Sequence, residues 1–265
     1  MDISSHADPL LAGIFVYLPV HLTTQKGCKS KKRMKRRDFF KKVALPPLLL
    51  GLGACSVKDD YSAYSTCFNT IREEEGPWPY PGGEANNPLN KSDITGGQPG
   101  IPLTLKIVVV NFSGHCAPVP DASVHIWHCN KDGYYSGYPN QSGANGTKDF
   151  SNENWLRGYQ VSDANGVVNF KTIYPGWETG RTTHIHVEVF VKGTLIVTTQ
   201  FAFPDKANDV VNASSQYSSR GANPTKNADD TVFNDSETHL ALETLLLDGT
   251  VTSGFTGNYQ LGLPL

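Results

Sequence analysis

The sequence has little charge of either sign and few methionines. Of its 265 residues, 18% are charged, the formal net charge is -2, and only 2 residues are methionine. Nucleic acids are bound through clustered lysine and arginine, so this balance excludes an extended basic surface and indicates a small partner rather than a nucleic acid. No apolar run reaches the roughly 20 residues that a membrane-spanning helix needs.

The abundant residue types favour strands and turns. The chain contains 25 glycines and 17 prolines, and valine, threonine, tyrosine and phenylalanine occur in short runs between them. No internal repeat is visible. We therefore predict an all-β fold, a single β-sandwich over residues 67–265 with long loops and little helix.

Residues 34–55 have the pattern of an export signal. A basic start containing Arg36 and Arg37 is followed by a short apolar stretch and by small residues before Cys55. The arginine pair resembles the twin-arginine export signal, and Leu52 to Cys55 resembles a bacterial lipobox in which the cysteine is acylated. We expect a lipid anchor on Cys55 that attaches the protein to a membrane of the bacterial cell envelope.

The segments on either side of this signal complete the predicted organisation. Residues 1–33 do not fit the signal that follows them, and we interpret them as a misassigned N-terminal extension. Residues 56–66 form a polar tether. An oxidising compartment permits one disulfide among Cys67, Cys116 and Cys129, and the sequence does not choose among the three possible pairs.

Within the domain, alternating and apolar runs predict six strands, preceded by an extended arm rich in proline, glycine and asparagine. The expected strands are Leu103–Asn111, Ala122–Cys129, Gly158–Ser162, Val167–Ile173, Thr183–Val191 and Leu195–Phe203. The clearest turns are Ala164-Asn165-Gly166 and Lys192-Gly193-Thr194. We predict a long loop region at Asp205–Asp235, and either a helix or a strand at Thr238–Leu247.

The strongest candidate for chemistry is the pair His184 and His186. Successive side chains of a strand alternate between faces, so both imidazoles point the same way while Ile185 and Val187 point the other way. A His-x-His pair on a rigid apolar strand offers two neutral nitrogen ligands to a metal ion.

Three further segments resemble the intradiol ring-cleavage dioxygenase family in order and spacing. They begin with the run from Val124 to Ser136, continue with Arg157-Gly158 and the residues up to Pro175-Gly176, and end with Arg181-Thr182-Thr183-His184-Ile185-His186 and Gln200. The resemblance extends from about Cys67 to the C-terminus.

This resemblance implies a site and a reaction. It implies a non-haem Fe(III) centre with Tyr135, His184 and His186 as ligands, which binds an aromatic diol and reacts it with molecular oxygen, cleaving the ring between its hydroxyl-bearing carbons. Arg181 would stabilise negative charge on the ring, and Gln200 would orient the substrate. A three-residue loop centred on Gly193 would place Gln200 opposite His186, so we predict a bulged hairpin.

Glu178 departs from the family pattern, because it stands where the second tyrosine ligand is expected. It could bind the metal as a carboxylate, although its reference pKa near 4.3, against about 10 for tyrosine, makes it a weaker base. Tyr174 lies before Pro175, where no ligand is expected, and we assign it to packing. We also predict that His125 and His128 are structural or surface residues.

The substitution leaves alternatives to an active dioxygenase. One is an envelope binding module for an aromatic or glycan ligand that keeps the sandwich but has lost turnover. Another is hydrolytic chemistry at a different metal. Trp127, Trp155 and Trp177 could line an aromatic pocket, although packing in the core is the commoner role of tryptophan in a sandwich.

Overall fold

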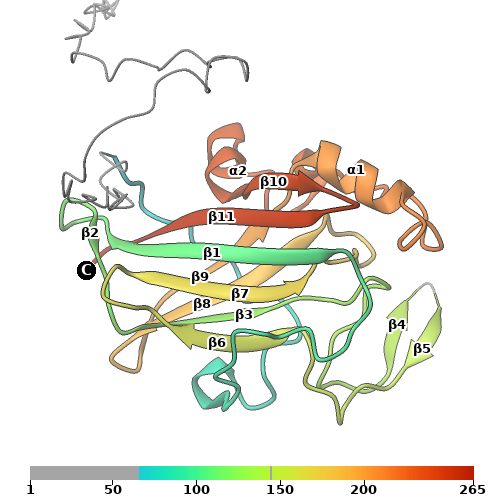
Figure 1. Ribbon diagram of the computed structural model, residues 1–265, viewed down its shortest axis with the longest axis horizontal. Coiled ribbons are helices and arrows are strands. Elements are labelled where there is room, and N and C mark those ends of the chain that lie inside the picture. The colour runs from blue at the N-terminus through green and yellow to red at the C-terminus, as the bar shows by residue number, and fades with distance from the viewer. Residues whose placement is uncertain (1–65, 144) are drawn as a thin grey trace, which may run out of the picture. The chain divides into compact units, whose positions relative to one another are not determined.

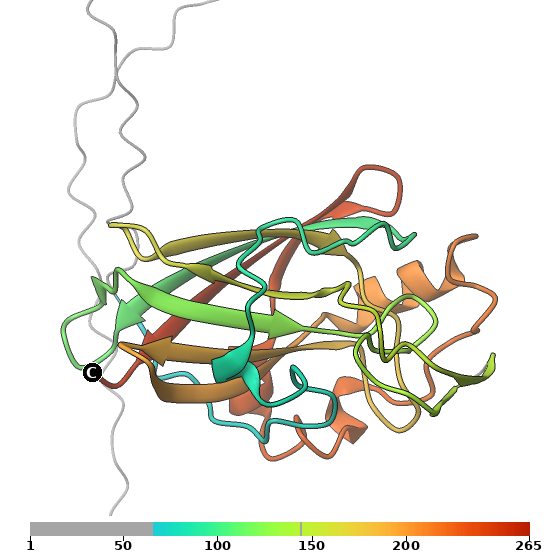
Figure 2. The ribbon, with the colours of Figure 1, turned by 90° about the horizontal axis from the view of Figure 1, so that it is seen from below.

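The computed structural model describes residues 66–143 and 145–265, so the predictions for the export signal, for Cys55 and for residues 1–33 lie outside the described part. Two sheets pack face to face (Figures 1 and 2). One has the order β10-β11-β1-β2, with β7 also paired to β1, and the other has the order β6-β3-β8-β9. In these residues, no helix is long and apolar enough to cross a bilayer.

The strands are mostly those that the sequence predicts. Their bounds are β1 Pro102–Asn111, β2 Ala117–Pro118, β3 Ala122–Trp127, β4 Gln141–Gly143, β5 Gly146–Lys148, β6 Arg157–Val161, β7 Val167–Ile173, β8 His184–Val191, β9 Thr194–Ala202, β10 Leu246–Thr250 and β11 Gly254–Leu263. All six expected strands are present within two residues at either end. The all-β sandwich is confirmed.

The sandwich core lies between the two sheets. Leu105, Ile107 and Phe170 face it from the β1 sheet, and Ile126 and Val187 face it from the β8 sheet. Alternation along β8 therefore turns His184, His186 and Glu188 to the opposite, outer face of their sheet. Because this face is buried as well, something else in the chain must cover it.

The cover is residues 66–101, which we call the N-terminal arm. The arm is extended, as the sequence predicts, except for one short 3-10 helix that was not predicted, η2 at Glu84–Asn86. The backbone of Glu73 donates to the carbonyl of Thr198 on β9, and the carbonyl of Trp78 accepts from Arg157 on β6. A disulfide between Cys67 and Cys116 fixes the start of the arm beside β2, while Cys129 is a buried free thiol.

Two expectations about the C-terminal third need correction. The stretch Asp205–Asp235 is not wholly loop, because it opens with helix α1 at Asp205–Ala213 and contains the 3-10 helix η3 at Asn227–Asp229. Pro204 is the residue before the first turn of α1, and Val211 lies on the buried side of the helix. Helix α2, Glu237–Glu243, precedes β10, so both alternatives for Thr238–Leu247 occur in succession.

The predicted bulge is present, but not in the predicted loop. Lys192 and Gly193 form a two-residue turn with positive φ values of 52° and 77°, and the register then shifts between Val189 and Phe190. The extra residue therefore lies within β9. The shift places Gln200 directly opposite His186, which is the pairing that the sequence predicts.

Candidate metal centre

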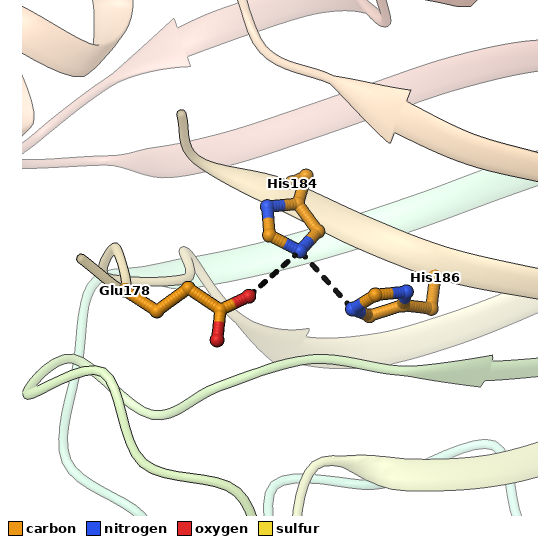
Figure 3. A group of neighbouring side chains, drawn as sticks. All are labelled: Glu178, His184 and His186. Carbon is orange, nitrogen blue, oxygen red and sulfur yellow. Dashed lines mark hydrogen bonds and ion pairs between the residues drawn. The ribbon is translucent and has the colours of Figure 1, made fainter. Parts of the chain in front are cut away.

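The predicted metal ligands converge on one point of the outer face of the β8 sheet. The hydroxyl of Tyr135 lies 3.1 Å from Nε2 of His186, 3.4 Å from Nε2 of His184 and 3.3 Å from Oε1 of Glu178. The two Nε2 atoms are 3.0 Å apart, and Oε1 of Glu178 is 3.3 Å from that of His184. Figure 3 shows the carboxylate and both imidazoles turned toward one another.

These separations suit a metal ion. Donors about 2.0 to 2.1 Å from a common ion in tetrahedral geometry lie about 3.3 Å from one another, close to the separations found here. Glu178, His184 and His186 also form a three-residue group whose ligand atoms all lie within 4.8 Å of one another. Two imidazoles, a phenol and a carboxylate are donors that iron accepts.

Hydrogen bonding leaves this cluster with more acceptors than protons. Nδ1 of His184 donates to the backbone carbonyl of Thr182 at 2.8 Å, so in the neutral form of the ring, the form that binds a metal, Nε2 carries a lone pair toward the cluster. Tyr135 has one proton to donate and three acceptors within reach. A bound cation would satisfy the remaining lone pairs, so the residues fit a metal.

Burial and charge tune the ionisation of these groups. Burial raises the pKa of Tyr135 well above its ordinary value, and the charge of Glu178 adds to the shift. Burial lowers the pKa of His186 well below its ordinary value, with the charge of His184 acting in the same direction. For Glu178, burial acts to raise the pKa, but the hydrogen bond and the charge of His184 outweigh it, so the pKa is lowered. Without a metal, Tyr135 is therefore a neutral phenol beside a carboxylate.

Arg181 and Gln200 lie beside the cluster and contact each other. Nη2 of Arg181 donates to Oε1 of Gln200 at 2.7 Å, and Nε2 of Gln200 donates to the backbone carbonyl of Glu74 in the arm at 3.1 Å. The structure thus brings together all six predicted site residues, Tyr135, Glu178, Arg181, His184, His186 and Gln200.

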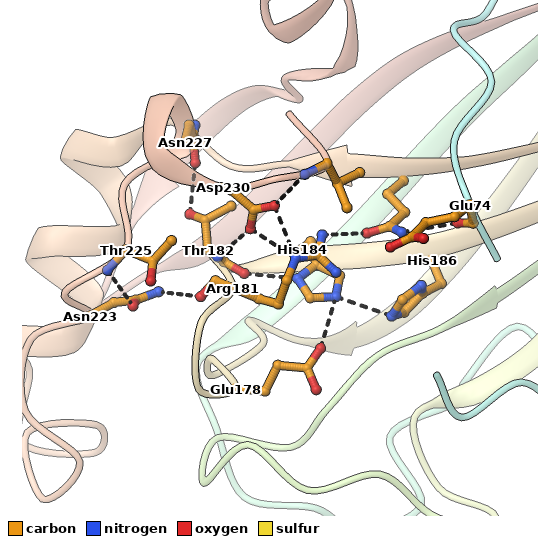
Figure 4. A network of polar contacts seen from close by, with 12 residues as sticks. Glu74, Glu178, Arg181, Thr182, His184, His186, Asn223, Thr225, Asn227 and Asp230 are labelled. Atoms are coloured by element: carbon orange, nitrogen blue, oxygen red, sulfur yellow. Dashed lines mark hydrogen bonds and ion pairs between the residues drawn. The ribbon is translucent and has the colours of Figure 1, made fainter. Parts of the chain in front are cut away.

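Other residues that support the site were not predicted. The carboxylate of Asp230 accepts from Nε of Arg181 and from the backbone N–H of Thr182, as Figure 4 shows. Asn227 accepts from the hydroxyl of Thr182 at 2.7 Å. Both lie in the segment that we expected to be loop, where no sequence pattern distinguishes them from the surrounding polar residues.

Aromatic rings close the other side of the cluster. Trp127 stacks on the ring of His186 with centroids 5.0 Å apart, and Trp78 of the arm stacks on Tyr135 at 6.2 Å. Trp155 is core-packed, and Arg220 lies over Trp177 at 4.1 Å. Of the three tryptophans weighed from the sequence, Trp127 thus stacks on the ring of a predicted ligand.

Tyr174, His125 and His128, which the sequence assigns to structural roles, form hydrogen bonds or ion pairs with residues other than the predicted ligands. Tyr174 is buried and donates to Asn208 at 2.8 Å. His128 is buried, and its Nε2 lies 2.7 Å from the hydroxyl of Thr172. His125 is buried as well, 3.2 Å from a carboxylate oxygen of Glu84.

The fold and the site together define an all-β sandwich with a candidate non-haem metal centre on one sheet face. Residues 74–218, more than half of the chain, match the family model described as Dioxygenase. The chain belongs to the intradiol ring-cleavage dioxygenase family.

Individual relatives agree with this assignment. Catechol 1,2-dioxygenase 1 of Acinetobacter lwoffii is 29% identical over 150 residues, which are 50% of this chain and 45% of that protein. The chain therefore aligns with less than half the length of this curated relative. The intradiol ring-cleavage dioxygenase from Tetranychus urticae is 27% identical, with a TM-score of 0.66, over 75% of this chain and 96% of that one.

A bacterial structure supports the fold alone. The dioxygenase domain of a dioxygenase and carbohydrate-binding protein fusion from Streptomyces sp. SirexAA-E is 24% identical, with a TM-score of 0.53. It covers 75% of this chain and 99% of the domain.

Proposed function

We propose that the protein is a non-haem iron dioxygenase that cleaves an aromatic diol between its two hydroxyl-bearing carbons. The observation that carries the proposal is the convergence of Tyr135 and Glu178 on the imidazole pair His184 and His186. Members of the family use non-haem iron, and these four side chains would hold it. When bound, Fe(III) would supply a Lewis acid that makes the diol hydroxyls more acidic and prepares the ring for reaction with oxygen.

Glu178 is the donor best placed to give way to a substrate. Its side chain is 18% exposed, whereas that of His184 is 2% exposed, and Tyr135 and His186 are buried. The carboxylate of Glu178 could accept the proton of a substrate hydroxyl. Its lowered pKa makes it a weaker base than a tyrosinate, so this proton transfer would need a hydroxyl that the metal makes acidic.

Arg181 and Gln200 would complete the substrate site. The guanidinium is permanently charged and held beside the cluster by Gln200, so it stabilises negative charge that develops on the ring. The aromatic rings of Trp78 and Trp127 exclude water from Tyr135 and His186.

Oxygen uptake tests this proposal. Iron-loaded protein should consume oxygen with at least one of catechol, hydroxyquinol or protocatechuate, and the product should have the mass of the diol plus two oxygen atoms. Glu178→Gln removes the charge at constant size and should lower iron affinity at least about tenfold. Glu153→Gln, at an exposed glutamate, is the matched control.

The replacement of a tyrosine ligand by Glu178 supports a second candidate, a binding module without turnover. In that case diols or glycans would bind to the iron-loaded protein while no diol gave oxygen uptake. This result would contradict the dioxygenase proposal and leave the fold assignment intact. Full activity with zinc and hydrolysable substrates would contradict both.

We also propose that the protein is exported by the twin-arginine route and anchored through Cys55 to a membrane of the bacterial envelope. The export pattern of residues 34–55 and the Cys67–Cys116 disulfide support this, because disulfides persist in oxidising compartments. In a producing bacterium, the wild-type chain should carry lipid at Cys55 and partition with membranes, and Cys55→Ser should not. An unmodified, membrane-free wild-type chain would contradict the proposal.

A further inference from the structure

A second polar cluster lies on the same outer sheet face as the metal centre. The hydroxyl of Ser123 is 2.8 Å from Nε2 of His125, and Nδ1 of His125 is 3.2 Å from Oε2 of Glu84. Ser123 and His125 are two residues apart on β3, so both point to one face, and Glu84 reaches them from η2 of the arm. None of the three belongs to the proposed metal site.

The direction of the hydrogen bonds in this cluster is fixed by chemistry. A carboxylate has no proton to donate, so Nδ1–H of His125 donates to Glu84, and Nε2 is left to accept from the hydroxyl of Ser123. The backbone N–H of Tyr80 and the side-chain amide of Asn87 also donate to Glu84, whose side chain is fully buried. Hydroxyl, imidazole and carboxylate thus stand in the order that activates a serine nucleophile.

The cluster borders a cavity that can admit a small substrate. The cavity has a volume of about 290 Å³, and its lining includes Ser123, His125, Tyr159, Phe190 and Lys192. His125 and Phe190 form a buried floor, while Lys192 lies exposed at the rim. Ser123 is half-buried, so its hydroxyl is reachable from the cavity.

The walls of the cavity indicate the class of substrate. Tyr159 stacks on His125 at 4.7 Å with an interplanar angle of 13°, and Phe190 meets the same ring at 4.9 Å. A lining made of three rings suits a flat aromatic group. Lys192 brings positive charge to the rim, where an ester carbonyl would gain negative charge during attack. Asp121 at the rim and Glu188, paired with His125 across β3 and β8, are the other charged neighbours.

We propose that Ser123, His125 and Glu84 form a second catalytic site, which hydrolyses small esters of phenols. The Ser123 oxygen attacks the ester carbonyl while its proton passes to Nε2 of His125. The carbonyl then re-forms, the bond to the phenol oxygen breaks, and the phenol leaves with that proton. Water attacks the acyl-serine in the same way, releases the carboxylic acid and restores the hydroxyl. This inference does not rest on the proposed dioxygenase activity.

A purely structural role would explain less of this arrangement. Glu84 also lies 4.0 Å from Arg157, so the Glu84 and His125 pair does fasten the arm to the sheet. Fastening the arm does not require a hydroxyl on Nε2 of His125, on the side of the ring away from Glu84.

The test uses the full chain with a metal chelator present, which separates this activity from any metal chemistry. With 4-nitrophenyl acetate, the wild-type protein should release 4-nitrophenolate in a burst and carry an acetyl group on Ser123, mapped by peptide mass spectrometry. Ser123→Ala should abolish the burst, and His125→Asn should slow it at least about a hundredfold. Ser113→Ala, at an exposed serine, should leave it unchanged.

Labelling with phenylmethanesulfonyl fluoride tests the reactivity of Ser123 in the wild-type protein, without any variant. It should sulfonylate Ser123 in preference to exposed serines such as Ser113. Folded wild-type protein with no acyl or sulfonyl group on Ser123, or an equal burst from folded Ser123→Ala, would overturn the proposal.

Discussion

Arg181 and Asp230 form a buried ion pair in which one guanidinium N–H faces both oxygens of one carboxylate. Nε of Arg181 lies 3.0 Å from Oδ1 and 2.9 Å from Oδ2 of Asp230, and Asp230 is fully buried. On its other side, Arg181 donates a hydrogen bond to the side chain of Gln200, which in turn donates to the backbone carbonyl of Glu74. The proposed catalytic arginine is thus held between the C-terminal segment and the arm (Figure 4).

Asp230→Asn should lower kcat for ring cleavage more than it lowers iron content. The amide cannot balance the guanidinium charge, so Arg181 shifts from its position, and misplacing such a group costs about a hundredfold in rate. Steady-state kinetics and iron analysis of folded protein measure the two effects. Asp229→Asn, at the exposed neighbour, is the control, and iron loss equal to the loss of kcat would contradict a positioning role.

A side chain at Gly76 would collide with a proposed metal ligand, and this predicts an effect of Gly76→Ala on iron binding. A Cβ at Gly76, where φ is +72°, would lie 2.6 Å from Cε1 of His186, whereas one at Gly82, where φ is +95°, would meet nothing within 4 Å. Both alanine variants incur backbone strain, but only Gly76→Ala should displace the imidazole and weaken iron binding, by about tenfold or more. Equal iron affinities in the two variants, measured by titration, would contradict this.

Glu188 should make stability depend on pH. Burial raises its pKa to about 7 from the ordinary 4.5, so between these values the folded protein keeps a proton that the unfolded chain has lost. The contribution of Glu188 to the free energy of unfolding should therefore fall as pH rises from about 4.5 to 7 and then level off. Glu188→Gln should remove this contribution, so the fall between pH 5 and pH 8 becomes smaller, and the variant should be roughly 1 to 3 kcal/mol more stable than wild type at pH 8.

Denaturant titrations at pH 5 and pH 8 measure the Glu188 effect. Glu153→Gln, at an exposed carboxylate, controls for the loss of one negative charge and should reproduce the wild-type pH dependence. A Glu188→Gln protein with the same pH dependence as wild type would show that this carboxyl does not titrate with the shifted pKa.

The Cys67–Cys116 disulfide should stabilise both the fold and the arm. Its cysteines are 49 residues apart in sequence, and a loop of this length corresponds to about 4 kcal/mol of chain entropy removed from the unfolded state. Replacing both cysteines with serine should lower Tm and also weaken iron binding, because the arm covers His186. Replacing the free Cys129 gives the comparison for a cysteine outside the disulfide, and an unchanged Tm in the double variant would contradict the prediction.

The sequence predicts the strands and the ligand pair because both depend on local alternation. The strand Val167–Ile173 was predicted with the bounds that the structure has, and the alternation that separates His184 from Ile185 also places the metal centre on the outer face. The pairing of Gln200 with His186 is confirmed, but the family resemblance, not the turn residues, indicated it, because the three-residue loop predicted to produce the pairing is absent.

The features missed from the sequence depend on contacts between distant segments. Strand β11, Gly254–Leu263, pairs in parallel with β1, and its scattered glycines hide the strand pattern. Asp230 meets Arg181 across 49 residues of sequence, and the choice of Cys116 as the partner of Cys67 likewise required the fold.

The visible spectrum of iron-loaded protein, read together with its iron content, tests the central claim most directly. We expect one iron per chain and a charge-transfer band from the Tyr135 phenolate, because ferric iron bound to a tyrosinate absorbs visible light. Tyr135→Phe should lose the band while His184 and His186 retain some iron. A colourless wild-type protein with one ferric iron per chain, or a band unchanged in Tyr135→Phe, would contradict the assignment of Tyr135 as a ligand.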